Sequence, residues 1–156
     1  MTMTACLWFD TQGEDAATFY CSVFPASRIV GVTNWGPENP EREGTALTVD
    51  FELDGQKFVA LNGGPQFPFT EAVSFQIPCR DQEEVDYYWT GLQADGGRES
   101  DCGWLKDRFG MSWQVVPTRL PELLADPDKE RANRAMQAMM RMQKLVIADL
   151  EKAADG

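Results

Sequence analysis

The sequence predicts an α+β fold in which two βαβββ modules form one open, curved eight-stranded sheet, followed by C-terminal helices. Both halves of the chain repeat one order of elements: a strand, a turn, a helix with paired aromatic residues, then further strands. The pair Phe19-Tyr20 recurs as Tyr88-Trp89, 69 positions later (88 minus 19). We expect a single domain over 1–156, with module one at about 4–62, module two at about 71–118 and a helical extension at 120–154.

In module one, residues 5–9 predict a short strand, and apolar residues three and four positions apart predict a helix over 14–24 that Pro25 ends. Another strand is expected over 28–34. Polar and apolar residues alternate over 45–53, which is typical of a half-buried strand. Asp54-Gly55 then favours a hairpin turn into a strand at 56–61.

Module two begins with a predicted strand at 72–77. Asp81, with Glu84 three residues later, has the spacing of a capping box and predicts the start of a helix that ends at Asp95-Gly96-Gly97. Short strands are expected near 102–106 and 111–116, joined by a turn. Beyond them, Pro127 and Asp128 begin a predicted helix, and Ile147 with Leu150 indicates a last short one.

The charge balance excludes several classes of partner. Fourteen basic residues face twenty-five acidic ones, for a net charge of −11, so we expect neither nucleic-acid binding nor attachment to an anionic membrane. Residues 1–4 lack the basic start of a signal peptide, and no apolar run is long enough for a membrane span. The four cysteines are widely spaced and indicate reduced thiols, which favours a cytoplasmic protein.

The chain contains no histidine. This removes the usual base of a catalytic triad, the commonest zinc ligand and the histidine proton shuttle. Any catalysis would have to use carboxylates, thiols, lysine, tyrosine or bound water.

Several segments of the chain carry a family resemblance when they are taken together in this order. The segments are Leu-Trp-Phe-Asp (7–10), Ala-Ala-Thr-Phe-Tyr (16–20), Val-Phe-Pro (23–25), Leu-Asn-Gly-Gly-Pro (61–65), Glu-Ala-Val-Ser-Phe (71–75), Glu-Glu-Val-Asp-Tyr-Tyr-Trp (83–89), Cys-Gly-Trp-Leu-Lys-Asp (102–107) and Phe-Gly-Met-Ser-Trp-Gln-Val-Val-Pro-Thr (109–118). They resemble PhnB-like proteins of the vicinal oxygen chelate superfamily, which includes glyoxalase, dioxygenase, and fosfomycin- and bleomycin-resistance proteins. The resemblance covers about residues 5–154 and implies a fold and a homodimer more firmly than an activity.

In metal-using members of the superfamily, four strands supply His, Glu or Gln ligands. The resemblance places these positions at Thr4 or Ala5, near Ala60, at Ser74 and at Gln114. Only Gln114 is a reasonable ligand, with Glu71 as a weak substitute, so we expect neither a metal nor another cofactor. A methyltransferase label used for the family finds no support, because Gly63-Gly64 precedes Pro65 instead of opening a helix after a first strand.

Strand alternation predicts a polar, uncharged pocket with Trp8 as its aromatic floor. Such a pocket would bind a small aromatic or cationic molecule without a metal, and whether it catalyses anything is left open. One alternative is a metal-dependent isomerase, lyase or dioxygenase that recruits its metal through Gln114 and Glu71; another is a dimeric module without a ligand. The expected pocket residues are Cys6, Trp8, Asn62, Ser74, Gln76, Ser112 and Gln114.

Overall fold

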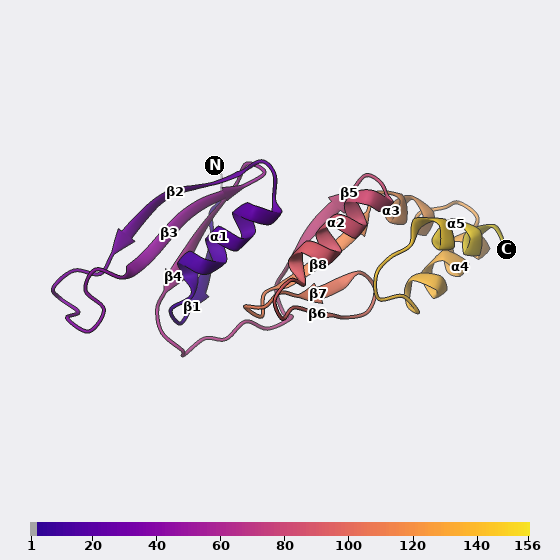
Figure 1. Ribbon diagram of the computed structural model, residues 1–156. Helices are drawn as coiled ribbons and strands as arrows, with labels where there is room; N and C mark the ends of the chain where they lie inside the picture. The colour runs from indigo at the N-terminus through magenta and orange to yellow at the C-terminus, as the bar shows by residue number, and fades with distance from the viewer. Residues whose placement is uncertain (1–2) are drawn as a thin grey trace. The chain divides into compact units, whose positions relative to one another are not determined.

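The computed structural model describes residues 3–156. Met1 and Thr2, which belong to the segment that we expect not to be a signal peptide, lie outside the described residues. The chain forms two compact units: one ends at Phe69, and the other comprises Thr70–Gly156. Each unit contains one βαβββ module, and helices follow the second (Figure 1), so the predicted modules and C-terminal helices are confirmed. Hydrogen bonding makes two four-stranded sheets, one in each unit, and their joining into one eight-stranded sheet stays a prediction.

Unit one follows the predicted order closely. Its sheet runs β1-β4-β3-β2, with β1 parallel to β4 and the remaining neighbours antiparallel. The helix stops two residues before Pro25, whose ring cannot continue it. The elements are β1 (Ala5–Phe9), α1 (Gly13–Val23), β2 (Ser27–Asn34), β3 (Ala46–Leu53) and β4 (Gln56–Asn62).

The core of unit one lies between α1 and one face of this sheet. Tyr20 of α1 is fully buried and stacks on Phe51 of β3, with ring centroids 6.1 Å apart, and Phe51 stacks on Phe58 of β4 at 5.2 Å. Alternation leaves the other face more open, with Cys6 and Trp8 on β1 beside Val59 and Leu61 on β4. We call this side of each sheet, opposite its helix, the open face.

Unit two repeats the topology with shorter outer strands. Its sheet runs β5-β8-β7-β6, with β5 parallel to β8. Two expectations shift: β5 lies two residues later than 72–77, and β6 was not predicted. The elements are β5 (Ser74–Cys79), α2 (Gln82–Leu92), β6 (Arg98–Glu99), β7 (Trp104–Lys106) and β8 (Ser112–Pro117).

The start of α2 matches half of the predicted capping box. The carboxylate of Asp81 accepts a hydrogen bond from the backbone N–H of Glu84 at 2.9 Å. Glu84 does not reach back to Asp81, because its carboxylate accepts from the backbone N–H of Arg80 at 2.8 Å and pairs with the Arg80 guanidinium.

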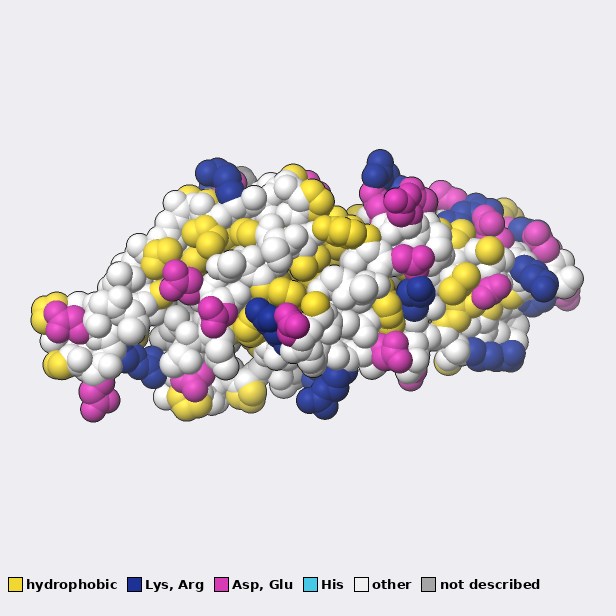
Figure 2. Space-filling view, in the orientation of Figure 1, with side chains coloured by type: hydrophobic (Ala, Val, Ile, Leu, Met, Phe, Trp, Pro, Cys, Tyr) yellow, Lys and Arg dark blue, Asp and Glu magenta, His cyan; other side chains and the backbone are white. Residues whose placement is uncertain are grey.

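Three helices complete unit two: α3 (Arg119–Leu124), α4 (Lys129–Met139) and α5 (Ile147–Asp155). They enclose a second apolar core with the end of β8, and Met136 and Met140 lie outside it, exposed. Acidic and basic side chains intermingle over these helices on the face shown in Figure 2. Within residues 3–156, no helix has both the length and the apolar character to cross a membrane. The core residues are Val116, Leu120, Leu123, Ala135, Leu145, Leu150 and Ala154.

Candidate functional site

In unit one, the predicted pocket residues Cys6 and Trp8 lie two positions apart on the open face of β1. Cys6 is exposed, and desolvation by neighbouring atoms raises the pKa of its thiol, so it carries less thiolate than an ordinary cysteine. The indole N–H of Trp8 donates to the carbonyl of Gly64 at 2.7 Å. The Phe67 ring packs edge-on against the indole, with the ring centroids 4.9 Å apart. Trp8 therefore anchors the segment after β4, and only part of its ring remains for a ligand.

Gly63 explains how this segment can lie so close to Trp8. A Cβ atom at position 63 would fall 2.2 Å from the indole ring, so any larger residue would displace the ring or the backbone. The glycine pair therefore allows close packing beneath an aromatic side chain.

Asn62 lies on the other side of the sheet from the predicted pocket. Its side chain is 5% exposed and points to the helix side, where its Oδ1 accepts from the backbone N–H of Gly13 at 2.8 Å. Its Nδ2 donates to the carbonyl of Ala46 at 2.9 Å. Asn62 thus ties the first turn of α1 to the start of β3, and both ends of its amide are occupied.

In unit two, Ser74 and Gln114 form a hydrogen-bonded pair on the open face. Gln114 Nε2 donates to Ser74 Oγ at 2.8 Å, from the neighbouring strands β8 and β5. Gln76 is exposed beside them. Ser112 is 1% exposed, and its hydroxyl has no hydrogen-bond partner among the described residues, so it is a buried polar group that a ligand would reach only if neighbouring side chains moved.

The positions that the family resemblance assigns to metal ligands do not fit a metal ion in this structure. Ala60 is buried on the helix side, so the open-face residues of β4 are Val59 and Leu61, which cannot ligate a metal. Glu71 pairs with Lys106 at 2.5 Å, and this hydrogen bond lowers the pKa of the Glu71 carboxyl. Over residues 3–156, no three His, Cys, Asp or Glu side chains gather in a group that could hold a metal ion.

The predicted pocket residues thus form two local groups. Cys6 and Trp8 belong to unit one, and Ser74, Gln76, Ser112 and Gln114 belong to unit two. Their joining into one pocket stays a prediction.

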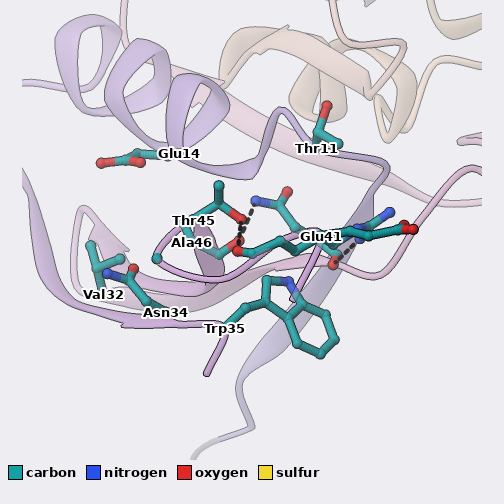
Figure 3. A pocket seen from close by; sticks show the side chains of 11 residues that line it. Thr11, Glu14, Val32, Asn34, Trp35, Glu41, Thr45 and Ala46 are labelled. Atoms are coloured by element: carbon teal, nitrogen blue, oxygen red, sulfur yellow. Dashed lines mark hydrogen bonds between the residues drawn. The ribbon is translucent and has the colours of Figure 1, made fainter. Parts of the chain in front are cut away.

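A cavity of about 640 Å³, which we did not predict, lies on the helix side of unit one. It is bounded by the start of α1, the end of β2, the start of β3 and the connection between these strands (Figure 3). Trp35, Arg42 and Glu41 come from that connection, and Glu14 comes from the first turn of α1. The sequence signal was only a Trp and several charged residues within a loop rich in Gly and Pro. The lining is completed by Thr11, Val32, Asn34, Gly44, Thr45, Ala46 and Asn62.

Comparison with known proteins places this geometry in a family. Residues 1–116 match the model of a family described as 3-demethylubiquinone-9 3-methyltransferase. No curated protein matches the chain. Among solved structures, the PhnB protein of Bacillus cereus is 32% identical, with a TM-score of 0.68 over 76% of this chain and 100% of that one.

Two more distant structures share the fold. Protein PA1353 of Pseudomonas aeruginosa is 18% identical, with a TM-score of 0.63 over 75% of this chain and 97% of its own. The fosfomycin resistance protein FosX of Listeria monocytogenes is 16% identical, with a TM-score of 0.53 over 78% of this chain and 96% of its own. The chain therefore belongs to the family described as 3-demethylubiquinone-9 3-methyltransferase, a PhnB-like family of the vicinal oxygen chelate superfamily.

Proposed function

We propose that this protein binds a small molecule, without a metal ion, on the open face of unit two. The observation that carries the proposal is the lining of that face: Ser74 and Gln114 already bond each other, and Glu71 is paired with Lys106. This lining offers hydroxyl and amide groups to a ligand but no imidazole to a divalent cation. In unit one, the open-face residues of β4 are apolar, and the exposed carboxylate of Asp50 on β3 belongs to no group within residues 3–156 that could hold a metal ion.

The chemistry of the open face favours a planar, uncharged or weakly cationic ligand. Gln114 and Ser74 can donate or accept hydrogen bonds, and the buried hydroxyl of Ser112 gains a partner if a ligand polar atom reaches it. Trp8, on the open face of unit one, offers part of its ring for stacking within that unit. Gln76 lies beside Ser74 and Gln114 on the open face of unit two, Cys6 lies two positions from Trp8 on that of unit one, and Asn62 has a structural role.

Metal-dependent catalysis is the alternative, because a FosX structure from Listeria monocytogenes contains Mn(II) and a dihydroxypropylphosphonic acid. Against it, Gln114 is hydrogen-bonded to Ser74 and Glu71 is paired with Lys106. Both groups would have to exchange these partners for a metal ion. Methyl transfer has less support still, since Gly63 and Gly64 pack against Trp8 and do not open a helix.

We also propose a homodimer in the cytoplasm. The dimer rests on the family resemblance, and the compartment rests on four cysteines that are all free. Sedimentation equilibrium would measure the mass in solution, and a monomer at every concentration would contradict the dimer.

Titration with benzamide, a planar aromatic amide, tests the open-face proposal. We expect saturable binding by calorimetry that weakens at least about tenfold in Gln114→Ala, since this variant loses the amide contacts of the open face of unit two. Gln137→Ala, at an exposed position on α4, is the matched control, and Trp35→Phe, in unit one, is a second control. Absent binding, or equal weakening in the controls, would contradict the proposal.

A further inference from the structure

We infer a second binding site, on the helix side of unit one, for a small organic cation: an ammonium group carried on an apolar or planar body. The site is the cavity of about 640 Å³ between the start of α1 and the connection of β2 to β3. All of its lining residues belong to unit one. It lies in a different unit from Ser74 and Gln114, and on the opposite face of its own sheet from Cys6 and Trp8, so the two proposals are independent.

The wall of the cavity is held in place by the chain itself. The backbone N–H of Trp35 donates to the carbonyl of Thr45 at 2.9 Å, and that of Gly44 donates to the carbonyl of Trp35 at 3.0 Å. Inside the loop, the backbone N–H and the hydroxyl of Thr45 both donate to the carbonyl of Arg42, at 2.9 and 2.6 Å. A pre-formed wall spares a ligand the entropy cost of ordering the loop.

Arg42 contributes to this wall more than it offers a free positive charge. Its Nη1 donates to the backbone carbonyl of Asn62 at 3.3 Å, and its Nη2 lies 4.0 Å from a carboxylate oxygen of Asp10. Its guanidinium carbon lies 6.0 Å from the centroid of the Trp35 ring. An anion would have to compete with Asp10 and the carbonyl for the same guanidinium.

The free charges of the cavity are negative. Glu14 and Glu41 both line it, both are exposed, and neither forms an ion pair within residues 3–156. Figure 3 shows them on different parts of the wall, one on the helix and one on the loop. Trp35 adds a half-buried indole, whose ring attracts cations, and a net charge of −11 favours the approach of a cation over an anion.

Phenethylammonium is a suitable probe, with neutral 2-phenylethanol and anionic 3-phenylpropionate as comparisons. We expect the ammonium to bind at least about tenfold more tightly than either, by calorimetry at low salt. In nitrogen-edited proton spectra, it should shift the indole N–H signal of Trp35, assigned by its loss in Trp35→Phe.

Charge-neutral variants locate the site. Glu14→Gln and Glu41→Gln should each weaken phenethylammonium binding about threefold to tenfold, and the double variant further. Asp15→Asn and Glu43→Gln are matched controls, because they remove the same charge from the same helix turn and the same loop but do not line the cavity. These controls should stay within about twofold of the parent.

Three results would overturn the inference. Equal weakening in the controls would mean that the net negative charge of the protein attracts the probe, and not the cavity. Equal affinity for 3-phenylpropionate would mean that Arg42, and not the two glutamates, determines which ligands bind. Absence of a Trp35 shift would exclude the cavity itself. Trp8→Phe and Gln114→Ala should leave phenethylammonium binding unchanged, so either site can fail without the other.

Discussion

The two modules share a topology but differ in their outer strands, and the difference decides where each can bind. In module one, β2 and β3 have eight residues each, and they extend beyond the start of α1 (Figure 1). In module two, β6 and β7 have two and three residues, and α3 to α5 supply additional apolar core. The long β2–β3 hairpin leaves a cavity beside α1. The repeated module therefore determines the sheet, while the connections between its strands determine where a binding site can form.

Asn62 in module one and Asp107 in module two are both buried polar side chains, but they are used in different ways. Asn62 bonds α1 to β3 in module one. In module two, the Asp107 carboxylate is 3% exposed and accepts from the backbone N–H groups of Phe109 and Met111 and from the Trp113 indole. A buried carboxylate with three donors should matter more to stability than a neutral amide with two partners.

Removing the Asp107 carboxylate should have the largest effect. We expect Asp107→Ala to lower the free energy of unfolding by about 4 kcal/mol, because three donors, two of them in buried hydrogen bonds, lose a charged acceptor. Urea denaturation would measure this. Asp101→Ala is the control, since Asp101 is exposed and forms no ion pair within residues 3–156, so its loss should cost under about 1 kcal/mol. Equal losses of unfolding free energy in the two variants would mean that the buried Asp107 carboxylate does not stabilise the module.

A methyl group at Gly103 should have the next largest effect. Gly103 has φ of +83°, and a Cβ there would lie 2.8 Å from the carbonyl of Val115 and 2.9 Å from Leu145. Gly103→Ala should cost about 3 kcal/mol by thermal or urea unfolding. Gly55→Ala shares the positive φ, +80°, but meets open space, so it should cost only about 1 kcal/mol. Similar costs would mean that the contact with Leu145 is loose.

Asn62→Ala should cost about 2 kcal/mol, because the N–H of Gly13 and the carbonyl of Ala46 lose their partner. A second change tests the geometry: a Cβ at Gly13 would lie 2.7 Å from Asn62 Oδ1, so Gly13→Ala should be less costly in the Asn62→Ala background. If the costs of Gly13→Ala and Asn62→Ala simply add in this double-mutant cycle, the two residues do not interact and the prediction is contradicted. Asn133→Ala, at an exposed position on α4, is the control.

The smallest effect should be a pH dependence in module two. Hydrogen bonds from Lys144, and then from Gln82, lower the pKa of Asp86 below its ordinary 3.8. A lowered folded-state pKa adds stability at higher pH, which is lost as the pH falls below about 4. Because Asp86 is half exposed, the loss should stay under about 1 kcal/mol.

Unfolding free energies measured at a series of pH values from about 6 down to about 3 would show whether the stability of Asp86→Asn falls less in acid than that of the parent. Asp149→Asn, at an exposed position on α5, should retain the parent's sensitivity. Identical pH profiles for all three proteins would contradict this assignment.

The sequence predicted most elements because their signals are local. Alternation and the Asp54-Gly55 turn identified the β3–β4 hairpin, and the Asp81 cap identified α2. Strand β6 was missed because Arg98 and Glu99 are both exposed and too few to show a period.

The sites were harder to predict because they depend on contacts between distant residues. Both faces of β4 carry apolar residues, so alternation alone did not show that Ala60 and Asn62 face the helix. The cavity depends on where the loop with Trp35 and Arg42 meets α1, and no local pattern reports that.

Metal dependence of benzamide binding tests the central claim most directly. The protein would be expressed with added manganese, nickel and zinc, then assayed for metal content and binding before and after treatment with a chelator. We expect less than one metal ion per chain, and the same affinity for benzamide before and after the chelator treatment. One tightly held divalent ion per chain, with binding lost on its removal and restored on its return, would contradict the claim.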